Sequence, residues 1–149
     1  MKRKKGLKSL RGNTSLDTSV LLEYLTGTNE GEILKQYFKT LKPEETVSCS
    51  IFTLSEIFYI LCRLKGVRFA QEKINDMLKS QIIQIYNTAD LAIQTGKIKC
   101  ERAISIVDCS CIATAKLAKA KAVFARKEKE LKREMERKPF EVEITFLKE

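Results

Sequence analysis

Short apolar segments suited to β-strands alternate with longer segments whose apolar residues recur at helical spacing. In residues 31–42, GEILKQYFKTLK, the apolar side chains repeat at the spacing of one face of a helix. The predicted strands are residues 14–17, 46–51, 81–87, 121–125 and 140–147, and the predicted helices are residues 19–26, 31–42, 53–66, 68–80, 88–103, 105–120 and 126–138. Strands that alternate with helices in this way predict an α/β fold, with a mostly parallel central sheet covered by helices on both faces.

The length of 149 residues predicts one folded domain. We expect residues 1–12 to form a mobile basic arm and residues 13–149 to form the domain. No apolar run reaches the roughly 18 to 20 residues of a membrane span, so no membrane partner is expected. The basic start, MKRKKGLKSLR, has no apolar stretch after it of the kind found in a secretory signal, which predicts a cytoplasmic protein.

The net charge of +9 is concentrated in two zones. Residues 1–11 carry six basic and no acidic side chains, and residues 119–138 carry nine basic and four acidic ones. Two basic zones on a nearly neutral body suit a polyanion such as RNA or DNA. The alternative is a solubilising tail and one solvated helix. The candidate contacts to a nucleic-acid backbone are Lys2, Arg3, Lys4, Lys5, Arg126 and Lys127.

The chain contains no histidine, which excludes Ser-His-Asp and Cys-His nucleophile systems. Its five cysteines show no CxxC spacing, so we expect buried free thiols and no zinc site. Neither a GxxxxGK[ST] loop nor a GxGxxG loop is present. Any catalysis must therefore rely on carboxylates, hydroxyls, lysines or metal ions.

Four acidic positions are candidates for such a site, the fourth being Glu128 or Glu130, and each also has a structural interpretation. Asp17 ends the first predicted strand and could cap the following helix, although the run Asp-Thr-Ser supplies more capping residues than a helix needs. Glu56 follows Thr53 at the spacing of a capping box, yet it is the only acid in the apolar run SCSIFTLSEIFYILC. Asp108 could likewise pair with Ser105 as a cap.

Glu128 and Glu130 lie just after the fourth predicted strand and could equally be solvated helix residues. Taken together, these acids are expected at or just after strands, each at the beginning of a helix, on the edge where open sheets bind ligands. Clustered carboxylates repel one another and favour hard divalent cations, so Mg²⁺ or Mn²⁺ is the expected cofactor. Such ions support phosphodiester hydrolysis without histidine.

Three segments resemble the PIN-domain nucleases, and most closely the small VapC-like toxins of toxin–antitoxin pairs. They are LDTSVLLEYL with Asp17, TLSEIFYIL with Glu56, and ISIVDCSCIATA with Asp108. The resemblance implies a three-layer α/β/α sandwich, Mg²⁺ or Mn²⁺ held by the acids, and cleavage of single-stranded RNA. It also implies supporting roles for Thr18, Ser19 and Ser105.

The resemblance implies partners as well: a homodimer, and an antitoxin protein that occupies the site of the toxin. The chain departs from the family in its late segment, ARKEKEL, which has glutamates where the family has a T-x-D-x-D-F pattern. The fourth acid is therefore either Glu128 or Glu130, and we favour Glu128 because it lies closer to the end of the predicted strand at residues 121–125. A rival interpretation is a non-catalytic RNA-binding or ribosome-associated PIN-like module, and a third is a purely structural partner in a complex.

Overall fold

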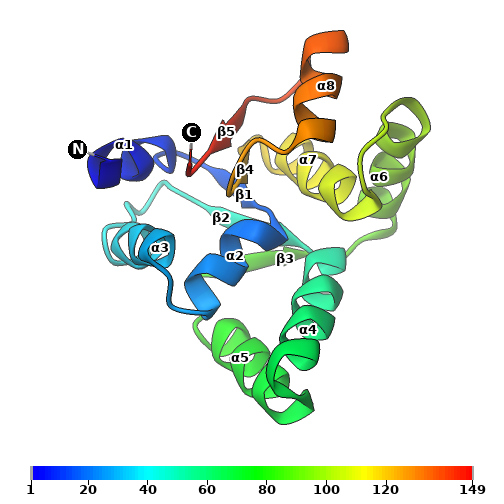
Figure 1. Ribbon diagram of the computed structural model, residues 1–149. Helices are drawn as coiled ribbons and strands as arrows, with labels where there is room; N and C mark the ends of the chain where they lie inside the picture. The colour runs from blue at the N-terminus through cyan, green and yellow to red at the C-terminus, as the bar shows by residue number, and fades with distance from the viewer. Residues whose placement is uncertain (1, 149) are drawn as a thin grey trace.

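A computed structural model describes the backbone of residues 2–148 and the side chains of residues 5–148. Figure 1 shows the arrangement of its helices and strands. The strands are β1 (Thr14–Leu16), β2 (Val47–Ser50), β3 (Ile83–Tyr86), β4 (Lys121–Phe124) and β5 (Ile144–Phe146). The helices are α1 (Lys2–Ser9), α2 (Thr18–Leu25), α3 (Asn29–Lys39), α4 (Ile51–Lys65), α5 (Val67–Lys79), α6 (Ala89–Glu101), α7 (Ile106–Ala118) and α8 (Lys129–Arg137).

The strands form one sheet in the order β3-β2-β1-β4-β5, and every neighbouring pair is parallel. In the central strand, Ser15 pairs in register with Ser48 on one side and with Ala122 on the other. The chain adds strands outward from β1 to β3, and then returns to place β4 on the other side of β1. Strand order therefore switches between β1 and β4, which is where open parallel sheets bind their ligands.

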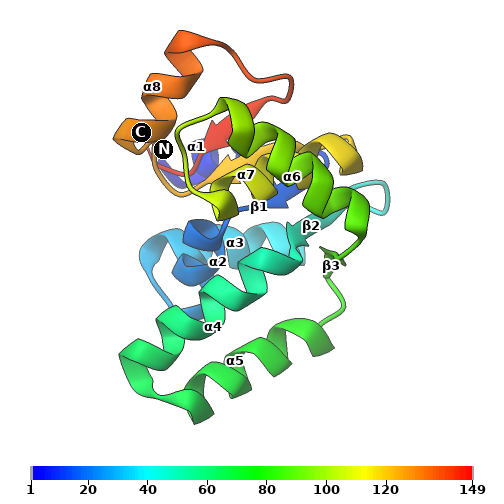
Figure 2. The same cartoon turned by 90° about the vertical axis from the view of Figure 1, so that its right-hand side faces the viewer.

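Two apolar clusters pack on opposite faces of the sheet and confirm the expected three-layer sandwich. The first joins the sheet to the first five helices through side chains such as Leu16, Leu34 and Ile57. The second joins it to the last three helices through side chains such as Cys109 and Phe124. Figure 2 shows α6 and α7 on one side of the sheet, with α2, α4 and α5 on the other.

Small side chains let α7 approach the middle of the sheet closely. The Ser15 hydroxyl donates a hydrogen bond to the Cys111 carbonyl oxygen at 2.8 Å, and the Cys111 thiol lies 3.5 Å from the Ser15 carbonyl oxygen. Both residues are fully buried. This contact holds α7 against the middle of β1, with Asp108 in the first turn of α7 and Asp17 directly after β1.

The basic start of the chain is a helix in the structure, so the expectation of a mobile arm is wrong. Leu10 is fully buried in the first cluster, and Leu7 packs against the same cluster. The Arg11 guanidinium donates to the Thr40 carbonyl oxygen at 3.0 Å and pairs with Glu45 at 3.5 Å. Basic residues dominate the sequence of this segment, so its pattern did not indicate these few packing and hydrogen-bonding contacts. The division of the chain into an arm of residues 1–12 and a domain of residues 13–149 stays a prediction.

Candidate active site

A cavity of about 400 Å³ opens at the carboxyl ends of β1 and β4, at the switch in strand order. Five of its lining residues are acids, and four of these come from four different helices or helix starts: Asp17, Glu56, Asp108 and Glu128. The structure therefore brings together the four carboxylates that the sequence predicted. Thr18, Ser19 and Arg126 also line this cavity, which we call the carboxylate cavity.

Asp17 both caps α2 and keeps one oxygen without a partner. Its backbone N–H donates to the Val123 carbonyl oxygen at 2.9 Å, which ties the end of β1 to β4. Its Oδ2 accepts from the backbone N–H of Ser19 at 3.1 Å and from the Ser19 hydroxyl at 2.6 Å. Its Oδ1 is buried and has no hydrogen-bond partner among residues 5–148. A cap alone uses one oxygen, so the second is available to a ligand.

Burial raises the pKa of Asp17 from 3.8 to about 6, against the lowering effect of the two Ser19 hydrogen bonds, and the charge of Glu56 raises it further. Ser19 also accepts a hydrogen bond from the Ala125 backbone N–H at 3.0 Å, so its hydroxyl joins α2 to the end of β4. The Thr18 hydroxyl is buried with no partner in the described part of the chain. Two of the three residues predicted to support the site, Thr18 and Ser19, thus lie beside Asp17.

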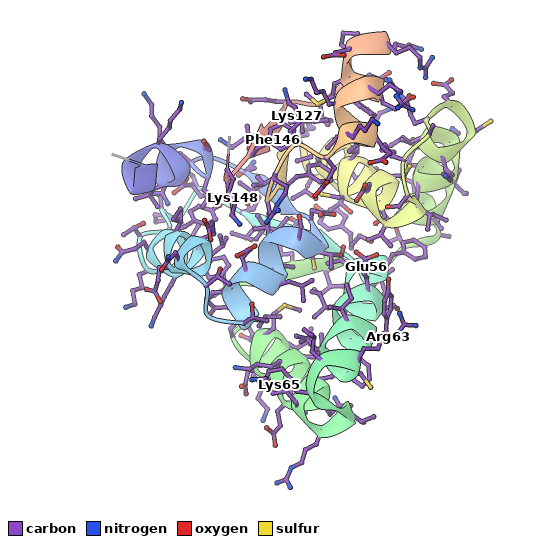
Figure 3. The ribbon with its side chains drawn as sticks, in the orientation of Figure 1. Glu56, Arg63, Lys65, Lys127, Phe146 and Lys148 are labelled. Carbon is purple, nitrogen blue, oxygen red and sulfur yellow. The ribbon has the colours of Figure 1, made fainter. Side chains whose placement is uncertain are left out.

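Glu56 is not part of a helix cap, so that interpretation is wrong. Helix α4 starts one turn earlier than the sequence suggested, because Ser50 is its cap and accepts from the Phe52 backbone N–H at 2.9 Å. Thr53 consequently lies inside the helix, where it is fully buried. Glu56 stands in the second turn and reaches the cavity from there (Figure 3). Its partly buried carboxylate therefore has no capping role.

Asp108 lies in the first turn of α7, where Ser105 is the cap and accepts from the Asp108 backbone N–H at 3.1 Å. The predicted Ser105 cap is confirmed, and it uses the backbone of Asp108 rather than its carboxylate. This acid follows α6 and not a strand, which corrects the expectation that every candidate follows a strand. Burial raises its pKa from 3.8 to about 7, with further raising by the charges of Asp17, Glu56 and, more weakly, Glu128.

The two glutamates of the late segment differ in position. Glu128 caps α8 with an extended backbone, makes no side-chain capping bond, and lines the carboxylate cavity. Glu130 is exposed in the first turn of α8 and is not among the residues that line the cavity. The geometry agrees with the choice of Glu128, whose role as a ligand stays a prediction.

The basic candidates are distributed unevenly around the cavity. Arg126 lines it, whereas the Lys127 ammonium lies 5.4 Å from the centre of the Phe146 ring, as Figure 3 shows for these two neighbours. Helix α1 packs against α3 and β5, and contributes no residue to the cavity lining. Lys5 on that helix is exposed, and the side chains of Lys2, Arg3 and Lys4 lie outside the described ones.

Sequence reasoning missed a fifth acid in the lining, Glu23. Its Oε1 lies 3.3 Å from the Lys148 ammonium, and its Oε2 accepts a hydrogen bond from the Thr28 hydroxyl. Lys148 also lies 3.6 Å from Glu30. Helical spacing could have indicated this residue, because Glu23 stands four residues after Ser19 and so lies on the same face of α2. Both oxygens of Glu23 have partners, and one partner is an ammonium group. Among the described side chains, none of the other four acids has such an ion pair.

The chemistry of the donor set fits a hard divalent cation. Carboxylate oxygens are the preferred ligands of Mg²⁺ and Mn²⁺, and the buried Asp17 Oδ1 lacks a partner. Within the described side chains, however, no three Asp, Glu or Cys residues are arranged so that they could hold a single ion. Burial is the main cause of the raised pKa values of Asp17 and Asp108, and repulsion by neighbouring carboxylates adds to it, so a bound cation would have to offset both effects.

Comparison with known families and structures agrees with this architecture. The family model of the PIN domain matches residues 15–133. A DNA-bound VapBC from Salmonella typhimurium has a TM-score of 0.66 and 20% identity, covering 91% of this chain and 98% of that one. The sarcin-ricin loop cleaving toxin VapC20 of Mycobacterium tuberculosis has a TM-score of 0.60 and 24% identity, covering 74% and 87%.

A toxin-antitoxin complex from Klebsiella pneumoniae has a TM-score of 0.54 and 18% identity, covering 80% of this chain and 88% of that one. The comparison with curated proteins finds no significant match. At such identities the structural likeness establishes the fold alone. Through residues 2–148, no helix has the length and apolar character needed to cross a membrane.

Proposed function

Because the chain belongs to the PIN-domain family, we propose that it is a metal-dependent endoribonuclease that hydrolyses phosphodiester bonds of single-stranded RNA. The observation that carries the proposal is the convergence of Asp17, Glu56, Asp108 and Glu128 on one cavity at the switch in strand order. A chain without histidine needs another way to activate water, and clustered carboxylates that bind a divalent cation provide one.

In this proposal Asp17, Glu56, Asp108 and Glu128 would hold Mg²⁺ or Mn²⁺. The bound ion would supply an activated water and charge neutralisation at the phosphate. Ser19 orients Asp17 by donating to its Oδ2, and so leaves Oδ1 for the ion. Ser105 fixes the start of α7 and so orients Asp108.

The remaining polar groups position the substrate. Arg126 lines the cavity and would bind a backbone phosphate next to the carboxylates. Lys127 and the lysines and arginine of α1, Lys2, Arg3, Lys4 and Lys5, would bind more distant phosphates. No protein side chain forms a covalent intermediate in this scheme.

We further propose an antitoxin protein as the partner of this chain, because structural neighbours are toxin–antitoxin complexes. A homodimer and a cytoplasmic location are also proposed, on the basis of the family resemblance. Identification of a small reading frame next to the gene, and co-purification of its product with this chain, would test the antitoxin partner.

The decisive experiment measures cleavage of end-labelled single-stranded RNA in Mn²⁺, in Mg²⁺ and in EDTA. We expect cleavage in either metal, none in EDTA, and loss of cleavage in Asp17→Asn. Glu130→Gln, which removes the same charge outside the cavity, should cleave normally. Cleavage that persists in EDTA or in Asp17→Asn would refute the proposal.

A second candidate is a non-catalytic RNA-binding module. It is favoured by one observation: no three acids within the described side chains are arranged to hold one ion. It predicts salt-sensitive binding of RNA without cleavage in either metal, so the same experiment decides between the two functions.

A further inference from the structure

An exposed aromatic side chain stands next to the carboxylate cavity. Tyr59 follows Glu56 by one turn of α4, and 44% of its surface is exposed. Its hydroxyl lies 3.4 Å from Glu56 Oε2, too far for a strong hydrogen bond but close enough to place the phenol beside that carboxylate. Tyr59 itself is not among the residues that line the cavity, so its flat apolar ring lies just outside the cavity, beside the lining residue Glu56.

A positive charge accompanies this ring. The guanidinium carbon of Arg63, one turn further along α4, lies 4.9 Å from the centre of the Tyr59 ring. Figure 3 shows Glu56 and Arg63 on the same helix. The structure gives Arg63 no ion pair with any carboxylate among the described side chains, so its charge is not neutralised by an acid of this chain.

The negative charge of the carboxylate cavity is the reason why a cation near it, such as Arg63, matters for binding RNA. Four carboxylates without basic partners repel an incoming phosphodiester, so a strand that enters needs cationic groups at the rim. Arg126 supplies one among the lining residues, and Arg63 places a second beside Tyr59, outside the lining. An aromatic ring beside an arginine is also the combination with which proteins hold unpaired bases and their phosphates.

We propose that Tyr59 and Arg63 form a subsite for one nucleotide of single-stranded RNA next to the phosphate that is cleaved. The base stacks on the Tyr59 ring, and Arg63 binds the phosphate of the same nucleotide. The inference rests on the proposed function, because it takes the carboxylate cavity as the place of cleavage. A base held in a duplex cannot reach the ring, so the subsite selects single strands.

A cation beside an aromatic ring does not by itself indicate a nucleotide site, and the chain contains an internal comparison. Lys65 and Lys73 lie 5.1 Å and 5.6 Å from the centre of the Phe69 ring. That group lies where α4 meets α5, and Figure 3 shows Lys65 at the end of α4 remote from Glu56. Among the described side chains, no hydrogen bond or ion pair joins these three residues to a lining residue of the carboxylate cavity, whereas Tyr59 contacts Glu56, so they serve as matched controls.

The test measures binding of fluorescein-labelled single-stranded RNA in EDTA, where no cleavage interferes. Tyr59→Leu should weaken binding by about 5- to 100-fold, the usual effect of losing one stacked base, while leaving the salt dependence unchanged. Arg63→Gln should reduce the slope of log affinity against log salt by ~0.7, the value for one phosphate contact to a single strand. Tyr59→Phe and Lys65→Gln should bind like the parent.

Abasic substitutions place the effect on one nucleotide. An abasic site is moved along the RNA one position at a time. At one position it should weaken binding to the parent but should not weaken binding to Tyr59→Leu any further, because that variant has already lost the ring on which the base stacks. A duplex of the same sequence should bind the parent and Tyr59→Leu equally. Because Tyr59 is exposed, the melting temperature of Tyr59→Leu should equal that of the parent.

Unchanged affinity of Tyr59→Leu for single-stranded RNA would overturn the subsite. Equal losses in Tyr59→Phe and Tyr59→Leu would also overturn it, because the hydroxyl beside Glu56 and not the ring would then matter. Dissociation of a dimer in Tyr59→Leu, with unchanged affinity per protomer, would assign the ring to contact between two copies. If instead Tyr59 governs binding but the parent cleaves no RNA in Mn²⁺, the subsite stands and the proposed catalysis fails.

Discussion

Neutralising Asp108 should stabilise the metal-free protein, by an amount that depends on pH. Its pKa is raised from 3.8 to about 7, so the folded protein holds this proton more tightly than the unfolded chain does. The stabilisation from protonation is therefore complete below about pH 4 and is lost as the pH rises through about 7. Asp108→Asn is never ionised and escapes that loss. Its advantage over the parent should thus grow between pH 4 and pH 8.

The size of the effect follows from the pKa values. The interval from 3.8 to about 7 corresponds to about 4 kcal/mol at ~1.4 kcal/mol per pH unit. Asp108 is partly exposed and shares its repulsion with Asp17 and Glu56, so solvent screening reduces the expected gain at pH 8 to about 1–2 kcal/mol. For a chain of this size that gain raises the melting temperature by roughly 3–6 °C. The Ser105 cap is unaffected, because it binds the backbone N–H.

The assay is thermal and urea unfolding in EDTA at pH 4, 6 and 8. Glu130→Gln is the matched control, because it removes one negative charge from the same part of the protein outside the cavity; its difference from the parent should be small at every pH. A constant difference between Asp108→Asn and the parent, or a less stable variant at pH 8, would refute the argument from repulsion. Addition of Mn²⁺ should raise the melting temperature of the parent and raise that of Asp108→Asn far less.

Three further predictions concern the walls of the site and α1. Glu128→Gln should reduce the Mn²⁺-induced rise in melting temperature, whereas Glu130→Gln should not; the reverse result would show that the fourth acid has been wrongly chosen. Lys148→Met should free Glu23 and tighten Mn²⁺ binding in calorimetry by about 2- to 5-fold, as expected for one partly exposed charge, and the double variant with Glu23→Gln should return to the parent value. Leu10→Ala should lower the free energy of unfolding by about 2–4 kcal/mol in urea, and a loss near zero would contradict the packing of α1.

The fold could be predicted from the sequence because local pattern and overall architecture agree. Each predicted strand and helix overlaps an observed one, and alternation of the two correctly predicted a parallel sheet with two helical layers. The exception is α1, where five basic residues in eight suggested a mobile arm. Leu7 on that helix and Leu10 just after it pack into the first cluster, and burial of these apolar side chains outweighs the preference of their exposed neighbours for water.

The site was harder to predict, because one residue type serves two purposes at a helix start. For Asp108 the cap and the candidate ligand coexist: the backbone uses Ser105, and the carboxylate remains for the cavity. For Glu56 the spacing to Thr53 imitated a capping box, while the actual cap was Ser50. A shift of one turn in the helix start changes the role of an acid completely. Sequence spacing alone does not fix that start.

Asp17 shows how the scaffold can hold an acid firmly and still leave one of its oxygens without a partner. Its two oxygens are divided: Oδ2 is bound by both donors of Ser19, while Oδ1 is buried without a partner. Ser19 is itself fixed by the Ala125 backbone N–H, so the orientation of Asp17 is set by β4, the strand that leads to Glu128. Replacing Ser19 with Ala should therefore leave the charge of the cavity intact but release Asp17 from its fixed rotamer. If orientation matters for the ion, Ser19→Ala should weaken Mn²⁺ binding while the repulsion among the carboxylates, measured by the stability gain from Asp108→Asn at pH 8, stays unchanged. Equal Mn²⁺ affinity in Ser19→Ala and the parent would show that the hydroxyl serves only to cap α2.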